Sequence, residues 1–486
     1  MKEKKRTALK LGISVFLIFV VLGLIIIIFQ LPKWRDIARF SHESYNGAFL
    51  AMYDVSTYNE GDFAAFRGVP TLKADYMLKS WKDLTKYMTK VFSSHNTVTN
   101  VYLGLDPVIM WNQSRNDNVK LKENLEKYLT PYVSARTDVS FEILLPCPSL
   151  QYWVEMEEEK MEEDLKAYQW LVEDLSVYSN VKMYFLGGEP WMIMNPGNYL
   201  DATHTNAHVS QKILLHAFCD QNYQIVPDNA PDMLNSLTDL VNQEKNSPAV
   251  YPDLSDWCIV FFGDSVLEYY SGSFSIPGVV SGLTGAETYN CGVGGIPATE
   301  DPFASLSFNR MVTRFLEQDT KGLEEDSNYV KGLTEYMQTG HEGKRYCFVV
   351  EFGLNDYFGG HAVENPEDIY DIGTYAGALR TGIRTLQDAY PDSEILLLTP
   401  TYTVLFSGGT EINSEKGGKL TDYVDAALRV AEEMNVHCLD NYADSGIDAE
   451  TYEKYLADGC HPNETGSFLL GNGILEYIGG VMTDEE

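Results

Sequence analysis

Short apolar runs alternate with amphipathic helical patterns through the second half of this 486-residue chain. The apolar runs lie at 257–262, 346–353, 394–400 and 436–440, and helical periodicity is clear at 375–390 and 421–434. Buried strands that alternate with helices indicate a parallel sheet with helices on both faces. We therefore predict an α/β fold for residues 257–486, with ligands bound beyond the carboxyl ends of the strands.

The N-terminus carries a different pattern. Residues 11–32 contain no charged side chain and are dominated by VFLIFVVLGLIIIIF, which is long enough to cross a bilayer as one helix. The basic residues before it place residues 1–10 in the cytoplasm by the positive-inside rule. The run is too long for a typical signal-peptide core and lacks a small-x-small cleavage site. We predict an uncleaved signal anchor in the cell membrane, single-pass, with the rest of the chain extracytoplasmic.

The remaining chain divides at 242–256, a polar stretch with two prolines that predicts a linker between a module at 40–241 and a domain at 257–486. The formal charge of −34 argues against nucleic acid as a partner, because phosphate binding needs a basic surface. The seven cysteines show no metal-like spacing, so we expect no metal. Cys291 and Cys460 can pair only if their loops meet.

Four polar motifs in the second half fit a site at the strand ends. They are GDSV (263–266), YNCGVGG (289–295), GLND (353–356) and DGCHPN (458–463). Each motif alone is a weak signal, because such tripeptides and Asp-x-x-His pairs are common in turns and helix caps. As a set and in this order, they supply every group that acyl transfer needs.

The residues of these motifs can be assigned roles. Ser265 offers a nucleophilic hydroxyl, His461 can take its proton, and Asp458 can orient the imidazole. The backbone N–H groups of Ser265 and Gly295 can stabilise a developing oxyanion together with the side-chain amide of Asn355. The chain has no GxSxG motif, which argues against the nucleophile elbow of ordinary α/β-hydrolases.

The same four motifs resemble the blocks that define the SGNH, or GDSL-type, hydrolase family. The resemblance covers residues 257–480. It implies a flavodoxin-like three-layer α/β/α fold and ester hydrolysis without a metal or other cofactor. It places Ser265 on the family's nucleophile, Gly295 and Asn355 on its oxyanion donors, and Asp458 and His461 on the rest of its triad. The stretch 301–345 is an insertion that we expect to form helices near the cleft.

The first half repeats part of this pattern. VYLGLDP (101–107), SFEILLPCPS (140–149) and NVKMYFL (180–186) match 349–356, 393–401 and 435–441 in order and spacing. DATHTN (201–206) then repeats the Asp-x-x-His motif with Asp201 and His204. The first half is therefore expected to be a second, related α/β module.

The match breaks down at the front of this module. Ser265 precedes Gly353 by 88 residues, and the same count back from Gly104 ends inside the predicted anchor. We therefore expect no complete nucleophile lobe there, with Ser56 as a weak substitute. Asp106 also replaces the amide of Asn355 by an anion. The first half thus resembles a degenerate SGNH-like module, in which Asp201 and His204 form a relic site.

These features predict a membrane-anchored extracytoplasmic serine esterase. It would remove or transfer acyl groups, O-acetyl in particular, on envelope glycans. A lipase or lysophospholipase remains an alternative, because residues 266–288 are largely apolar. A non-catalytic envelope binding or scaffold protein is an alternative from another class. The expected partners are an acylated saccharide or other ester and the membrane, with no nucleic acid.

Overall fold

The computed structural model describes residues 33, 35–219, 223–300, 305–325, 327–405, 412–413 and 418–482. The predicted cytoplasmic tail (1–10) and anchor (11–32) lie outside these ranges. None of the helices within them has both the length and the apolar character needed to span a bilayer. The chain forms two compact units, one of residues up to 192 with 199–246 and one of residues 193–198 with 247 onward.

The second unit contains the parallel sheet that the apolar runs predict. Its strands follow the spatial order β12-β9-β8-β6-β7, so the third, first and second strands in chain order are neighbours, as in flavodoxin-like folds. All pairings within this sheet are parallel. The strands of this sheet are β6 Trp257–Gly263, β7 Glu287–Asn290, β8 Arg345–Glu351, β9 Glu394–Leu398 and β12 His437–Leu439.

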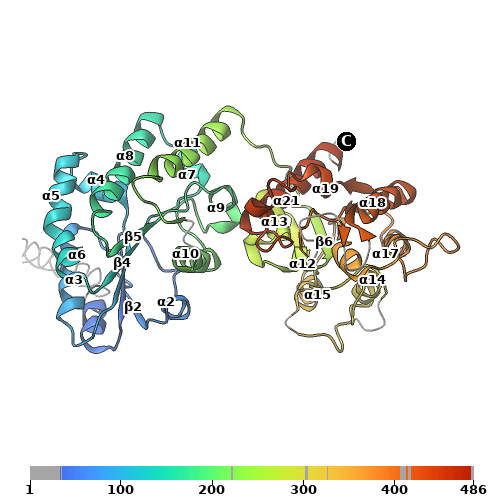
Figure 1. Cartoon of the computed structure of the whole chain (residues 1–486), viewed down its shortest axis with the longest axis horizontal. Helices are drawn as coiled ribbons and strands as arrows, with labels where there is room; N and C mark the ends of the chain where they lie inside the picture. Colours follow the sequence, from blue (N-terminus) through green and yellow to red (C-terminus); the bar gives the residue numbers. More distant parts are fainter. Residues whose placement is uncertain are drawn as a thin grey trace, which may run out of the picture. The chain divides into compact units, whose positions relative to one another are not determined.

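Helices cover both faces of this sheet. α13 packs against α21, while α14, α17 and α18 form a second packed group. Figure 1 draws the two groups on opposite sides of β6, which gives three layers. The helices are α12 Ser265–Glu268, α13 Ile276–Thr284, α14 Phe308–Glu317, α15 Asn328–Gln338, α16 Leu354–Gly359, α17 Tyr375–Ala389, α18 Leu420–Met434, α19 Asn441–Asp444, α20 Tyr452–Tyr455 and α21 Glu464–Tyr477. A two-residue antiparallel pair, β10 Ile412–Asn413 and β11 Gly418–Lys419, precedes α18.

The sequence explains where these helices start and which face they bury. Ser275 caps α13 by accepting a hydrogen bond from the Gly278 N–H, and Gly285 ends the helix in the left-handed region. α17 buries Leu379, Ile383 and Leu386 at intervals of three or four residues, so its apolar stripe faces the core. The predicted insertion at 301–345 forms α14 and α15, and the Asn328 side chain at the start of α15 donates to the Glu268 carbonyl.

The first unit has the same strand order, β2-β1-β3-β4-β5, again all parallel. Its strands are β1 Gly47–Ala51, β2 Thr71–Lys73, β3 Asn100–Gly104, β4 Ser140–Leu144 and β5 Val181–Tyr184. The helices of the first half are α2 Glu60–Arg67, α3 Trp81–Ser93, α4 Pro107–Gln113, α5 Asn118–Tyr128, α6 Thr130–Ala135, α7 Leu150–Val154, α8 Glu158–Leu175, α9 Pro190–Ile193, α10 Ala207–Cys219 and α11 Ala230–Asn246. Two parallel sheets of equal strand order therefore fit the two modules that the internal repeat predicts.

The residue count that placed the front of the first module inside the predicted anchor is wrong, because β1 and β2 provide the first two strands of the sheet. The count of 88 residues fails for a local reason. In the second half two helices, α14 and α15, lie between β7 and β8, whereas α3 alone connects β2 to β3. The shorter first half lacks this helical insertion and keeps the first strand.

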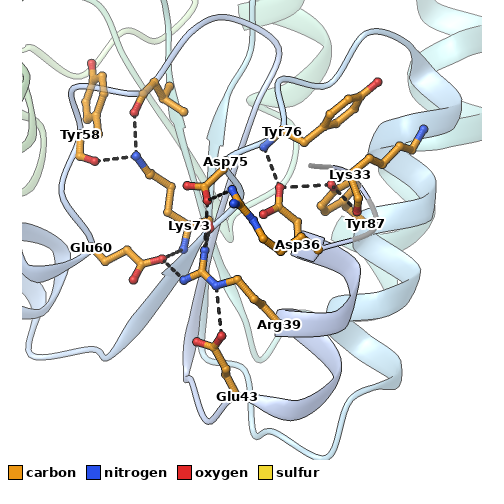
Figure 2. Close-up of polar contacts among 12 residues, drawn as sticks. Lys33, Asp36, Arg39, Glu43, Tyr58, Glu60, Lys73, Asp75, Tyr76 and Tyr87 are labelled. Carbon is orange, nitrogen blue, oxygen red and sulfur yellow. Dashed lines mark hydrogen bonds and ion pairs between the residues drawn. The ribbon is translucent and has the colours of Figure 1, made fainter. Parts of the chain in front are cut away.

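Two predicted boundaries also need correction. The helical residues 35–42 belong to the first unit, because Asp36 is fully buried and accepts a hydrogen bond from the Tyr76 N–H, and Arg39 pairs with Glu60 (Figure 2). The unit therefore starts before residue 40. At its other end α11 continues through Asn246, so the non-helical connection is 247–256, shorter than the predicted linker 242–256.

Candidate active site

The turn after β6 presents Ser265 at the carboxyl end of the central strand. Asp264 caps α12 by accepting a hydrogen bond from the Val266 N–H at 3.0 Å, so Ser265 becomes the first residue of that helix. Gly263 allows the close approach of β8, since an added Cβ would lie 2.6 Å from the carbonyl oxygen of Glu351. The first predicted motif is therefore a strand-to-helix turn that exposes a hydroxyl.

The Asp-x-x-His motif folds back on itself. Asp458 Oδ1 accepts hydrogen bonds from the N–H groups of Cys460 and His461 at 3.0 and 2.8 Å. Asp458 Oδ2 lies 2.7 Å from His461 Nδ1, and His461 Nε2 lies 2.9 Å from Ser265 Oγ. The structure thus brings the three predicted catalytic residues together in the order serine, histidine, aspartate.

The electrostatics of this group suit a general base. Partial burial opposes the charge of Asp458, but hydrogen bonds from the backbone and ring of His461 and from the Cys460 N–H outweigh it and lower the pKa of Asp458. An ionised Asp458 favours a proton on Nδ1 of His461. This tautomer leaves Nε2 free to accept the Ser265 proton.

The predicted oxyanion donors surround the same turn. Gly295 is exposed and has φ +75°, and no heavy atom would lie within 4 Å of an added Cβ, so its backbone is accessible. The Asn355 amide donates to Asp264 Oδ2 at 3.0 Å and, over a longer 3.3 Å, to the Ile296 carbonyl. Gly353 adopts φ +132°, a conformation open to glycine, which lets the chain turn sharply from β8 into α16.

Two further residues lie at this site that the motifs did not indicate. The exposed ring of Tyr269 stacks on His461, and Glu268 Oε2 accepts a hydrogen bond from the Gly294 N–H at 2.5 Å. Both follow Ser265 on or just after α12. Because both residues lie close to Ser265 in sequence, they could have been considered as site residues from the sequence. The contact between the rings of Tyr269 and His461, however, depends on a loop that is distant in sequence.

The cysteines do not form a disulfide. Cys291 and Cys460 are both buried free thiols, and burial raises the pKa of each. Cys460 lies beside Thr403, whereas Cys291 faces Gly332 on α15. Across the described ranges, no group of three or more acidic, histidine or cysteine side chains could hold a metal ion.

The Asp201–His204 pair of the first unit reproduces the local geometry of the second. Asp201 Oδ1 accepts from the His204 N–H at 3.0 Å, and Asp201 Oδ2 lies 2.6 Å from His204 Nδ1. Hydrogen bonds from His204 and Thr203 hold the pKa of Asp201 well below its usual range. The motif therefore builds the same turn in both halves.

The group facing His204 differs from that facing His461. His204 Nε2 lies 3.9 Å from Asp54 Oδ2, so a carboxylate occupies the place of a serine hydroxyl. Lys73 Nζ fixes this loop by donating to the carbonyl oxygens of Val55 and Tyr58 (Figure 2). The sequence did not single out Asp54, because counting 88 residues back from Gly104 leads past β1 into the predicted anchor.

Ser56 and Asp106, which take the sequence positions of Ser265 and Asn355 in the first module, are not catalytic groups in this geometry. The Ser56 N–H donates to Asp54, and the structure shows no contact between Ser56 and His204 among its described hydrogen bonds. Asp106 caps α4 by accepting from the N–H groups of Val108 and Ile109. Burial raises the pKa of Asp106 in spite of these bonds.

Comparison with known proteins agrees with the second unit's motifs. Residues 261–467 match the sequence pattern of the GDSL-like lipase/acylhydrolase family. A stretch of 158 residues, 32% of this chain, is 28% identical to a multidomain esterase of Ruminococcus flavefaciens. It covers 18% of that protein, so the chain spans less than a fifth of the curated relative that it matches.

Solved structures also align with part of this chain. Est24, a carbohydrate acetylesterase from Sinorhizobium meliloti, is 14% identical at a TM-score of 0.30, covering 46% of this chain and 99% of its own. The salicylyl-acyltransferase SsfX3 from a tetracycline biosynthetic pathway is 13% identical at a TM-score of 0.30, covering 48% and 56%. The family match therefore places a GDSL-like lipase/acylhydrolase domain at residues 261–467, within the second unit.

Proposed function

We propose that the second unit is a serine esterase that acts through an acyl-enzyme on Ser265. The observation that carries this proposal is the position of His461, with Nε2 2.9 Å from Ser265 Oγ and Nδ1 2.7 Å from Asp458 Oδ2. As Ser265 Oγ attacks an ester carbonyl, His461 Nε2 takes its proton. The tetrahedral intermediate then expels the alcohol, which receives that proton, and leaves the acyl group on Ser265.

The second half of the reaction reverses these roles. Water, or the hydroxyl of an acceptor, attacks the acyl-enzyme and gives its proton to His461, which returns it to Ser265 Oγ. The N–H groups of Ser265 and Gly295 and the Asn355 amide would stabilise the oxyanion in both steps. The 3.3 Å bond from Asn355 to the Ile296 carbonyl is long enough for a stronger acceptor to replace it.

O-Acetyl groups on envelope glycans are the substrate class that we propose. The exposure of Gly295 and of the ring of Tyr269 leaves the site open to an acyl group on a large carrier. The strong negative charge of the chain fits a neutral ester better than a polyanion. The apolar segment 11–32 would hold the enzyme at the membrane with this site outside the cell.

The lipase alternative loses its main support. The stretch 266–288 is apolar because it contributes to the core, since Leu267, Ile276 and Val280 are all buried. It therefore does not provide an exposed apolar lid. The carbohydrate esterase remains the better proposal.

A fluorophosphonate probe tests the proposal directly on the purified full chain. Wild type should be labelled, Ser265→Ala should not, and Ser393→Ala should be labelled like wild type, because Ser393 lies at the amino end of β9. Absence of labelling in wild type, or equal labelling of Ser265→Ala, would favour the scaffold alternative.

Two further measurements test the substrate and the location. Acetate release from acetylated glycan fractions, without fatty-acid release from phospholipid, supports the carbohydrate esterase, whereas the opposite result supports the lipase. Protease added to intact cells should digest the region after residue 32. Full protection of that region would contradict the proposed topology.

A further inference from the structure

An acidic side chain that the proposed reaction does not use lies beside the turn that carries the nucleophile. Glu351 is the last residue of β8 and is 1% exposed, and Asp264, beside Ser265, is 0% exposed. The two lie side by side because Gly263 and Glu351 are partners in the β6–β8 ladder. Glu351 Oε2 would lie 3.1 Å from a Cβ added at Gly263, the residue before Asp264, and the carboxyl groups of Glu351 and Asp264 interact directly.

Glu351 lacks the partner that a buried carboxylate usually needs. In the first unit the buried Glu142 has such a partner, since Arg67 Nη2 lies 2.7 Å from its Oε2. Neither oxygen of the Glu351 carboxyl group accepts a hydrogen bond of ordinary geometry within the part of the chain that the structure describes, and the nearby Asp264 N–H only partly offsets the effect of burial. Burying an unpaired charge in this way is so unfavourable that the group keeps its proton instead.

The other ionisable groups around Glu351 do not supply a positive charge. They are Asp264 on the β6–α12 turn, Tyr375 on α17 and Cys460 beside His461, with Asp356 on α16 acting on Asp264. Asp356 already accepts hydrogen bonds from the N–H groups of Ala298 and Thr299. Every neighbour is therefore an acid, and any charge on these neighbours disfavours a second charge on Glu351.

The hydrogen-bond donors decide which of the two carboxyl groups holds the proton. Two carboxylates have no hydrogen to share, so a hydrogen bond between them requires that one of the pair is protonated. Asp264 accepts from the Val266 N–H and from the Asn355 amide, and both bonds favour its charged form. Glu351 has only the Asp264 N–H nearby, and burial together with the charge of Asp264 outweighs it and raises the pKa of Glu351 well above its ordinary range.

We propose that Glu351 is a positioning residue, whose neutral carboxylic acid donates a hydrogen bond to Asp264 and thereby holds the Asn355 amide beside Ser265. The connection runs from the Glu351 O–H to the Asp264 carboxylate, and from there to the Asn355 side chain and the N-terminus of α12. The proposed role of Glu351 rests on the proposed esterase function, in which Asn355 stabilises the oxyanion. A donor displaced by about 1 Å can slow such a reaction roughly a hundredfold.

Two neutral replacements of similar length test this role. Glu351→Gln keeps an N–H donor for Asp264, so kcat and KM should stay within about threefold of wild type. Glu351→Met removes the donor, so kcat should fall at least tenfold while KM changes less than threefold. An equal loss in both variants would overturn the proposal. Melting temperatures should be measured for both, and if Glu351→Met does not fold, Glu351→Gln and the infrared measurement below decide.

A double-mutant cycle separates positioning from a general structural defect. In an Asn355→Ala background, Glu351→Met should lower kcat by less than about twofold, because the amide that it positions is already absent. A further tenfold loss in that background would overturn the proposal.

Infrared difference spectroscopy of the full chain at neutral pH tests the proton itself. Wild type should show a protonated-carboxyl band that Glu351→Gln lacks, and an unchanged band pattern would overturn the proposal. This measurement does not depend on catalysis. If wild type shows the band but Ser265 is not labelled by fluorophosphonate, the esterase function fails and the shared proton stands.

Discussion

The rings of Tyr269 and His461 lie parallel, with centroids 4.8 Å apart and planes inclined by 5°. In the proposed reaction His461 becomes an imidazolium when it takes the Ser265 proton, and the face of an aromatic ring attracts a cation. Tyr269 is 44% exposed, so a contribution of about 0.5–1 kcal/mol is expected for this contact.

Replacing Tyr269 by leucine should therefore lower kcat/KM for a small acetyl ester about two- to fivefold. Tyr269→Phe keeps the ring and should stay near wild type, which separates the ring face from the hydroxyl. A loss in Tyr269→Phe as large as in Tyr269→Leu would show that the hydroxyl, not the stacking, matters.

Asn355→Ala should lower kcat about a hundred- to a thousandfold with little change in KM, because the lost amide acts mainly on the oxyanion of the transition state. Initial-rate kinetics on a chromogenic acetate ester measure both constants. Asn309→Ala is a suitable control, since its amide donates to the Ala378 carbonyl on another helix. A rise in KM with unchanged kcat would assign Asn355 to substrate binding instead.

The arrangement of Ser265, His461 and Asp458 was predictable because most of its geometry is local. Asp458 and His461 are three residues apart and build their own turn through backbone hydrogen bonds. Ser265 needed only its place after an apolar run, because the alternation of apolar runs and helices predicts a parallel sheet with its site beyond the carboxyl ends of the strands. The same locality explains why Asp201 and His204 form an identical turn in the first unit.

Contacts between separate elements were not predictable in this way. Glu351 was visible as a charged residue in the apolar run YCFVVEFG, but its burial without a cation depends on which side chains β6, α16 and α17 bring to it. Asp54 escaped because a fixed residue count ignores insertions such as α14 and α15. A search that began from the apolar run at 47–52 would have reached it.

The two Asp-x-x-His motifs permit the same substitution in the same local structure. His461→Ala should abolish hydrolysis of a chromogenic acetate ester, whereas His204→Ala should leave kcat/KM within twofold of wild type. The reason is that His204 faces the carboxylate of Asp54, which has no hydroxyl proton to give. A large loss in His204→Ala, with an unchanged melting temperature, would contradict the assignment of Asp201 and His204 as a relic.

Glu351 should also make the stability of the second unit depend on pH. An unfolded glutamate loses its proton near pH 4.3. In the native protein the pKa of Glu351 is raised well above that value by burial and by Asp264. Above pH 4.3 the native state therefore binds more protons than the unfolded state, and stability falls as the pH rises toward the native pKa.

Glu351→Gln has no such proton, so its stability should lack this fall. The melting temperature of Glu351→Gln minus that of wild type should be smallest near pH 4 and should increase steadily toward pH 8. Calorimetry of both proteins in matched buffers measures this difference, and contributions from other carboxyl groups such as Asp458 are present in both. A difference that stays constant across the range would mean that Glu351 is ionised in the native protein, and its proposed hydrogen bond to Asp264 would then have no proton.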